Sequence, residues 1–144
     1  MDSESVVNML REDIAEWEKL VAVLEAHPEE SLHDPGSPSW TSRDVYAHLA
    51  RWMGHSIASL EARLSGGTFP PVPGTDDEIN ARWQQEDSGL SLAKARDRAQ
   101  QTFEQRRRII MSVPGERWDK ELGRLARWDG AEHFAKHRSY IIIA

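Results

Sequence analysis

Two stretches of this sequence decide both its fold and its chemistry: WTSRDVYAHLARW at residues 40–52 and DGAEHFAKHRSYI at residues 129–141. Each carries a helix-capping pattern, a Thr or Asp followed three residues later by an acidic residue, and so predicts a helix that starts there. His133 and His137 stand four residues apart, and this spacing places both side chains on one face of a helix. His48 can complete the set from another helix. The three imidazoles are therefore candidates to hold one metal ion.

The composition limits what the chain can be. With 144 residues, it is expected to form a single domain over residues 1–144. Its formal net charge of −6 argues against a nucleic-acid partner, since phosphate binding usually goes with a basic surplus. The sequence has no cysteine, which excludes disulfides, thiolate ligands and cysteine nucleophiles. Any metal must therefore be held by nitrogen and oxygen.

Neither a signal peptide nor a membrane span is recognisable in the sequence. Residues 1–17 lack a basic start and an uninterrupted apolar core. No run of about 18 apolar residues occurs anywhere in the sequence. We therefore expect a cytoplasmic protein without a membrane partner, acting on a small molecule.

Apolar residues at intervals of three and four predict long amphipathic helices. Together with the capping patterns, they place four helices at residues 5–26, 42–64, 91–113 and 129–141. No run alternates in the manner of a strand, so no sheet is expected. The prediction is an all-α four-helix bundle, a fold in which inward side chains on facing helices build metal and ligand sites.

Segments rich in proline and glycine separate these helices. Residues 27–39 are predicted to be a loop, and His27 and His33 within it are expected to be solvated and are excluded from the site. Residues 65–77 precede a short helical piece, EINARWQQED, which makes this connection a long crossover. Such a crossover permits the second and third long helices to run parallel. Residues 115–128 are expected to be irregular or partly helical.

Further polar side chains flank the predicted metal site. Asp44 lies one turn before His48 and is a candidate to orient its ring, and His55 is a candidate general base. We prefer the simpler interpretations, a helix cap for Asp44 and an ordinary polar contact for His55, because caps are common at such positions. The run at residues 106–108, three arginines, is expected on a solvated helix face, with an anionic substrate as the alternative.

Six tryptophans give this chain an apolar surplus over what four short helices need to bury. Trp52, Trp83 and Trp128 are candidates to line the mouth of a binding pocket. Packing in the core is the alternative, and we prefer it because aromatic residues at helical spacing usually pack. The same surplus predicts a homodimer.

Four features of the sequence point to a known family. These are a Trp and a Ser/Thr cap that open the second helix, the Asp-Val-x-x-His-Leu core at residues 44–49, the segment with Asn80 and Trp83 after the crossover, and the closing His-x-x-x-His. In these features, which span nearly the whole chain, the sequence resembles the DinB-like superfamily of metal-binding four-helix bundles. That superfamily includes mycothiol-dependent maleylpyruvate isomerases, bacillithiol transferases and the DfsB-like group.

The resemblance implies an up-down-down-up bundle with a metal bound by His48, His133 and His137. It also implies water or a low-molecular-weight thiol at an open coordination position, and a homodimer. Asn80 is a candidate substrate-binding residue, as are the three tryptophans named above. The ion is expected to be zinc or nickel, since three imidazoles suit both. The chain departs from the mycothiol enzymes in one ligand, because it has a histidine where those enzymes use a carboxylate.

Two hypotheses for the function follow. The first is a metal-dependent enzyme of DinB-like type, a hydrolase or thiol-dependent transferase acting on a small electrophile in detoxification or stress. The second is a non-catalytic, dimeric helical bundle that binds a metal or a small ligand. The second stays open because the sequence shows no unmistakable general base beside the three histidines.

Overall fold

The computed structural model describes residues 1–29, 32–34 and 37–141, with the side chains of 32–34 and 37–39 left out of the description. Its elements are α1 (Ser3–Ala26), β1 (Leu32–Asp34), β2 (Ser37–Trp40), α2 (Ser42–Leu64), α3 (Asp76–Glu86), α4 (Leu92–Ser112), the 3-10 turn η1 (Gly115–Arg117), α5 (Lys120–Arg127) and α6 (Ala131–Tyr140). The predicted all-α class is confirmed, and the long helices begin and end within a few residues of the predicted bounds. None of the described helices is long and apolar enough to cross a membrane.

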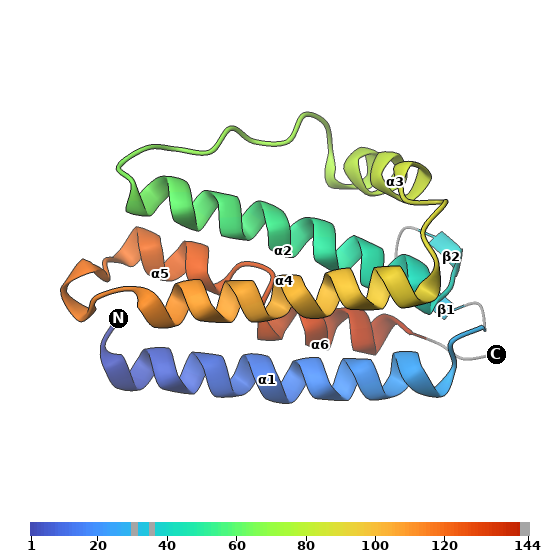
Figure 1. The fold of residues 1–144 in the computed structure, drawn as a ribbon, viewed down its shortest axis with the longest axis horizontal. Helices are drawn as coiled ribbons and strands as arrows, with labels where there is room; N and C mark the ends of the chain where they lie inside the picture. The colour runs from blue at the N-terminus through green and yellow to red at the C-terminus, as the bar shows by residue number, and fades with distance from the viewer. Residues whose placement is uncertain (30–31, 35–36, 142–144) are drawn as a thin grey trace.

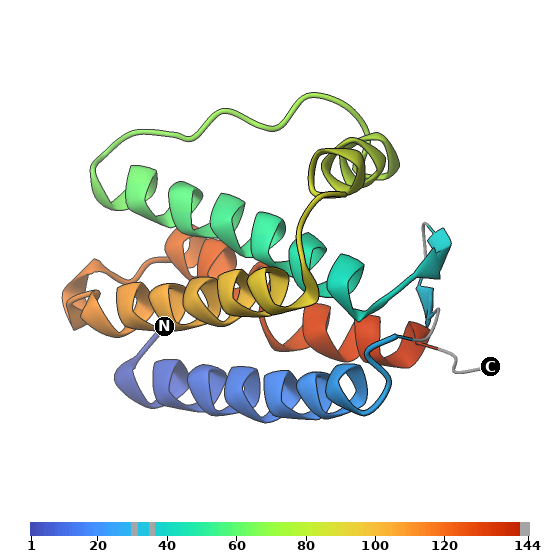
Figure 2. The ribbon, with the colours of Figure 1, turned by 45° about the vertical axis from the view of Figure 1, so that its right-hand side comes forward.

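The long helices lie side by side with nearly parallel axes. α2 packs along α4, and α1 packs along α6. Figure 1 shows α1 and α6 running from left to right and α2 and α4 in the opposite sense, and Figure 2 shows the same after a turn of 45°. α2 and α4 share a direction because the chain between them returns along the outside of α2 and through α3.

The connection between α1 and α2 differs from the prediction. A loop without strands was expected at residues 27–39, but β1 and β2 pair antiparallel there, with Leu32 opposite Trp40 and Asp34 opposite Ser37. Strands of three and four residues are too short to show the alternation that identifies a strand in sequence. His33 was predicted to be solvated, and its side chain lies outside the described residues.

An aromatic cluster joins α1, α4 and α6 at the centre of the molecule. The Trp17 ring stacks on Phe103 with ring centroids 4.8 Å apart, and Phe134 meets Trp17 edge-on at 5.1 Å. All three side chains are buried. Because Phe134 is held in this cluster, the rotation of α6 about its own axis is fixed, and the directions of His133 and His137 are fixed with it.

A buried ion pair ties the start of α6 to the rest of the bundle. Arg106 on α4, 1% exposed, pairs with Asp13 of α1 at 2.6 Å and also donates to the carbonyl of Ala126. The other oxygen of Asp13 accepts a hydrogen bond from the backbone N–H of Ala131 at 2.8 Å. The predicted solvated face is therefore wrong for Arg106. A run of arginines in the sequence does not reveal that a carboxylate from a distant helix meets one of them.

Candidate metal centre

The structure brings the three predicted histidines together. His48 comes from the second turn of α2, and His133 and His137 come from the first two turns of α6. Nε2 of His137 lies 3.0 Å from Nε2 of His48 and 2.9 Å from Nε2 of His133. One ligand atom from each residue lies within 4.8 Å of the others. This group can hold a metal ion, because three nitrogens around a tetrahedral ion at about 2.0–2.1 Å are separated by roughly 3.3 Å.

Two of the three rings are buried, and burial keeps the His48 ring neutral. His48 and His137 are 8% and 7% exposed. Burial, and then the neighbouring His137 and His133, lower the pKa of His48 well below its ordinary 6.5. Trp40 packs against the His48 ring with centroids 5.1 Å apart. At neutral pH, His48 therefore presents an unprotonated ring nitrogen in a fixed position, which is the form that metals bind.

Asp129 supports His133 from the side away from the other rings. Its Oδ1 lies 3.2 Å from Nδ1 of His133, four residues later in the chain, within ion-pair distance but without the geometry of a hydrogen bond. A carboxylate on the outer nitrogen orients an imidazole ligand and increases its basicity. The sequence pattern had suggested Asp129 as the helix N-cap, and this is wrong: Gly130 is the N-cap, and Asp129 precedes it with a left-handed φ of 58°. Sequence reasoning missed this contact, although the spacing of four residues between Asp129 and His133 could have indicated it.

A cavity of about 380 Å³ adjoins the three histidines, all of which line it. Two further kinds of side chain complete its walls. Trp52 and Tyr140 contribute aromatic surface, and Asp76, Asp77 and Lys136 contribute charge. The converging nitrogens are therefore reachable by a small molecule that enters the cavity.

Of the candidate substrate-binding residues, Trp52 and Asn80 lie at this cavity. Trp52 donates a hydrogen bond from Nε1 to Oδ1 of Asn80 at 2.8 Å, which links α2 to α3. Trp83 packs edge-on against Trp52, with centroids 4.9 Å apart, and lies under the guanidinium of Arg51. Trp83 thus supports the wall formed by Trp52.

The remaining candidates lie elsewhere. Asp44 caps α2: its Oδ2 accepts from the backbone N–H of Thr41 at 2.9 Å, and its Oδ1 pairs with Arg43 at 2.8 Å. These contacts fit the cap that we preferred for Asp44. Among the described residues, His55 and Trp128 both line a different cavity from the one at the histidines.

Comparisons with known proteins show the family and the fold of this chain. A model of the DinB superfamily matches residues 13–140, which confirms the resemblance identified in the sequence. The crystal structure of an uncharacterised protein from Escherichia coli UTI89 is similar, with a TM-score of 0.71 and 15% identity over 94% of this chain and 91% of that chain. Likeness at that identity shows the fold alone. A search of curated proteins finds no match.

Proposed function

We propose that this chain, which belongs to the DinB superfamily, is a cytoplasmic metal-dependent enzyme, a hydrolase or thiol-dependent transferase acting on a small electrophile in detoxification or stress. One observation carries the proposal: the ring nitrogens of His48, His133 and His137 converge at the wall of a cavity of about 380 Å³. A metal site that serves only the fold is closed by protein ligands, whereas a catalytic site keeps one position open.

The arrangement of the helices supports the proposed topology. The pairs α2 with α4 and α1 with α6 are those expected of an up-down-down-up four-helix bundle with a long crossover. In such a bundle, the ligands come from facing helices. This is how α2 and α6 supply the three histidines here.

The residues around the cavity have distinct tasks in this proposal. His48, His133 and His137 would hold a zinc or nickel ion, which would supply Lewis-acid chemistry to a small molecule in the cavity. Asp129 holds the ring of His133, and Trp52 gives the substrate an apolar surface fixed by its hydrogen bond to Asn80. Among the described residues that line the cavity, Lys136 is the only lysine or arginine. Since the chain has no cysteine, any thiol must be a separate small molecule.

One observation favours the alternative, a non-catalytic bundle that binds a metal or ligand. Asp129 contacts His133 at its outer ring nitrogen, 3.2 Å away, and so lies on the side of that ring away from the converging nitrogens. Asp76 and Asp77 at the cavity are exposed to solvent. Among the described residues, none is thus poised as a general base.

Metal analysis of protein purified without an affinity tag tests the ligand set. We expect one divalent ion per chain, lost in each of the variants His48→Ala, His133→Ala and His137→Ala. His27→Ala, which removes a histidine from the end of α1, is the matched control and should keep its metal. Wild-type metal content in all three ligand variants would show that the ligand assignment is wrong.

A cobalt-substituted protein separates the enzyme from the binding protein. If the fourth position is open, azide or a small thiol should change the cobalt spectrum, and turnover should rise with pH through the ionisation of the bound group, near pH ~7 for water on zinc. A spectrum indifferent to both additives, in a protein that loses its fold on chelation, would favour a structural ion.

A further inference from the structure

We infer a second ligand site, for a small uncharged aromatic molecule, between α2, α5 and the segment at residues 67–71. Four large hydrophobic side chains are exposed among the described residues, and two of them, Phe69 at 44% and Trp128 at 39%, are aromatic. Both line one cavity of about 250 Å³. The chain after α2, to which Phe69 belongs, arches over that helix on the side away from α1 (Figure 1), and Trp128 directly follows α5.

A polar group without a partner faces the same place. His55 on α2 lines this cavity, and its Nε2 is buried without a hydrogen-bond partner among the described residues. The His55 ring meets Phe69 edge-on at 5.4 Å and Trp52 at 5.9 Å. A buried ring nitrogen that lacks a partner is costly, and such groups in native proteins usually bind water or a ligand. A hydroxyl or ring N–H of a bound ligand would donate a hydrogen bond to Nε2 of His55 after a small movement of Phe69.

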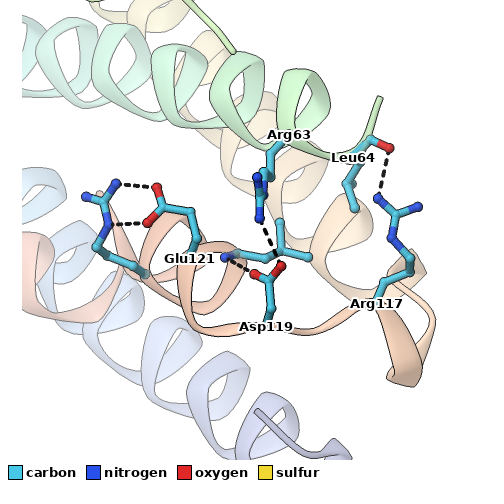
Figure 3. A network of polar contacts seen from close by, with 7 residues as sticks. Arg63, Leu64, Arg117, Asp119 and Glu121 are labelled. Atoms are coloured by element: carbon cyan, nitrogen blue, oxygen red, sulfur yellow. Dashed lines mark hydrogen bonds and ion pairs between the residues drawn. The ribbon is translucent and has the colours of Figure 1, made fainter. Parts of the chain in front are cut away.

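The charged residues at the rim are already paired. Arg63 contacts Asp119 at 3.0 Å, as Figure 3 shows, and Arg124 contacts Glu121 at 3.0 Å. Arg124 also lies over the Trp128 ring, 4.6 Å from its centroid. Two guanidinium groups matched by two carboxylates leave the rim with no net charge. The walls therefore favour an uncharged flat ring with one hydrogen-bonding group, such as a phenol or an indole.

This site is separate from the metal centre. The three candidate metal-binding histidines do not line this cavity. Among the described residues, none lines both this cavity and the one beside the histidines. Ser56 on α2 donates to the carbonyl of Trp128 at 3.2 Å, so one wall is anchored to the helix that carries His55. The inference does not depend on the proposed enzymatic function.

Titration with phenol and with indole, followed by the indole N–H resonances of the tryptophans, tests the site. We expect saturable binding that shifts the Trp128 resonance, with cyclohexanol binding at least tenfold more weakly. Phe69→Ala and Trp128→Ala should each weaken phenol binding at least tenfold. Met111→Ala, which removes an exposed side chain of α4, is the matched control and should leave binding unchanged. His55→Phe should remove the preference for phenol over benzene, because it keeps the ring and loses the nitrogen.

Three results would overturn the inference. The first is phenol affinity that is unchanged in both Phe69→Ala and Trp128→Ala. The second is phenol binding that disappears in His137→Ala, which would place the ligand at the metal centre instead. The third is a dimer in sedimentation that Trp128→Ala dissociates, since a second copy of the chain would then cover this surface.

Discussion

His48 belongs to the candidate metal centre and also makes the stability of the fold depend on pH. Burial keeps its ring neutral in the folded protein, as the lowered pKa indicates, whereas the unfolded chain takes up a proton near pH 6.5. The stability that comes from this difference is fully present above pH 6.5 and is lost as the pH falls below it.

We therefore predict that the metal-free protein loses up to about 1.0 kcal/mol of unfolding free energy between pH 6.5 and 5.5 through His48. His48→Gln cannot be protonated and should show a shallower fall over the same range. Urea unfolding at both pH values, with a chelator present, measures the difference. Identical pH profiles for the two proteins would show that His48 is not the group responsible.

Asp129 offers a test of ligand orientation at the scale of one side chain. Asp129→Asn keeps the shape of the side chain, and Asn tolerates the left-handed backbone found there, so the fold should be little affected. Because the carboxylate beside His133 Nδ1 is lost, metal affinity should fall roughly 10–100-fold. Competition with a chromophoric chelator measures it. Asp77→Asn, at an exposed carboxylate of the same cavity, is the control, and an equal loss there would refute orientation by Asp129.

At the scale of elements, the start of α6 requires glycine at position 130, because a side chain there would meet buried atoms. A Cβ added at Gly130 would lie 2.6 Å from Nη2 of Arg106 and 2.7 Å from Oδ1 of Asp13, both inside the buried ion pair. We predict that Gly130→Ala destabilises the protein by about 2–4 kcal/mol, because the pair must separate while still buried.

Thermal and urea unfolding of this variant check the prediction. Gly54→Ala is the control, since a Cβ at that helical glycine of α2 meets no atom within 4 Å. It should be neutral or stabilising by up to about 1 kcal/mol. If Gly130→Ala unfolds like the wild type, the ion pair does not constrain α6.

The sequence predicted those elements that depend on local patterns. The spacing of Trp17, Val21, Leu24 and their neighbours identified α1. The capping pattern at Thr41 and Asp44 identified the start of α2, where both hydrogen bonds of the capping box are present. The same reasoning brought the three histidines together, because helical spacing and the family resemblance together suffice for that.

What the sequence did not reveal depends on contacts between distant segments. Asp13 caps α6 from 118 residues away, so the local pattern at residues 129–132 predicted the wrong cap. Arg106 is buried because Asp13 meets it. His55 and Trp128 share a cavity that no spacing rule joins, since Trp128 reaches it from a separate helix.

For the whole molecule, we predict a homodimer. The sequence motivates it by its apolar surplus, and Val7 on α1 and Met111 on α4 are 48% and 59% exposed in the single chain. Sedimentation velocity at micromolar concentration measures the assembly. A single species of 16.4 kDa over the whole concentration range would contradict it.

The separation of the ligands along the chain has a consequence for the whole molecule. His48 and His137 are 89 positions apart (137 − 48), so an ion bound by both closes a loop of more than half of the sequence. In a chain without cysteine, such an ion acts as a removable cross-link, restricting the unfolded ensemble as a disulfide does. Its contribution grows with the concentration of free metal around the protein. The time for which the chain stays folded would then depend on the concentration of free metal around it.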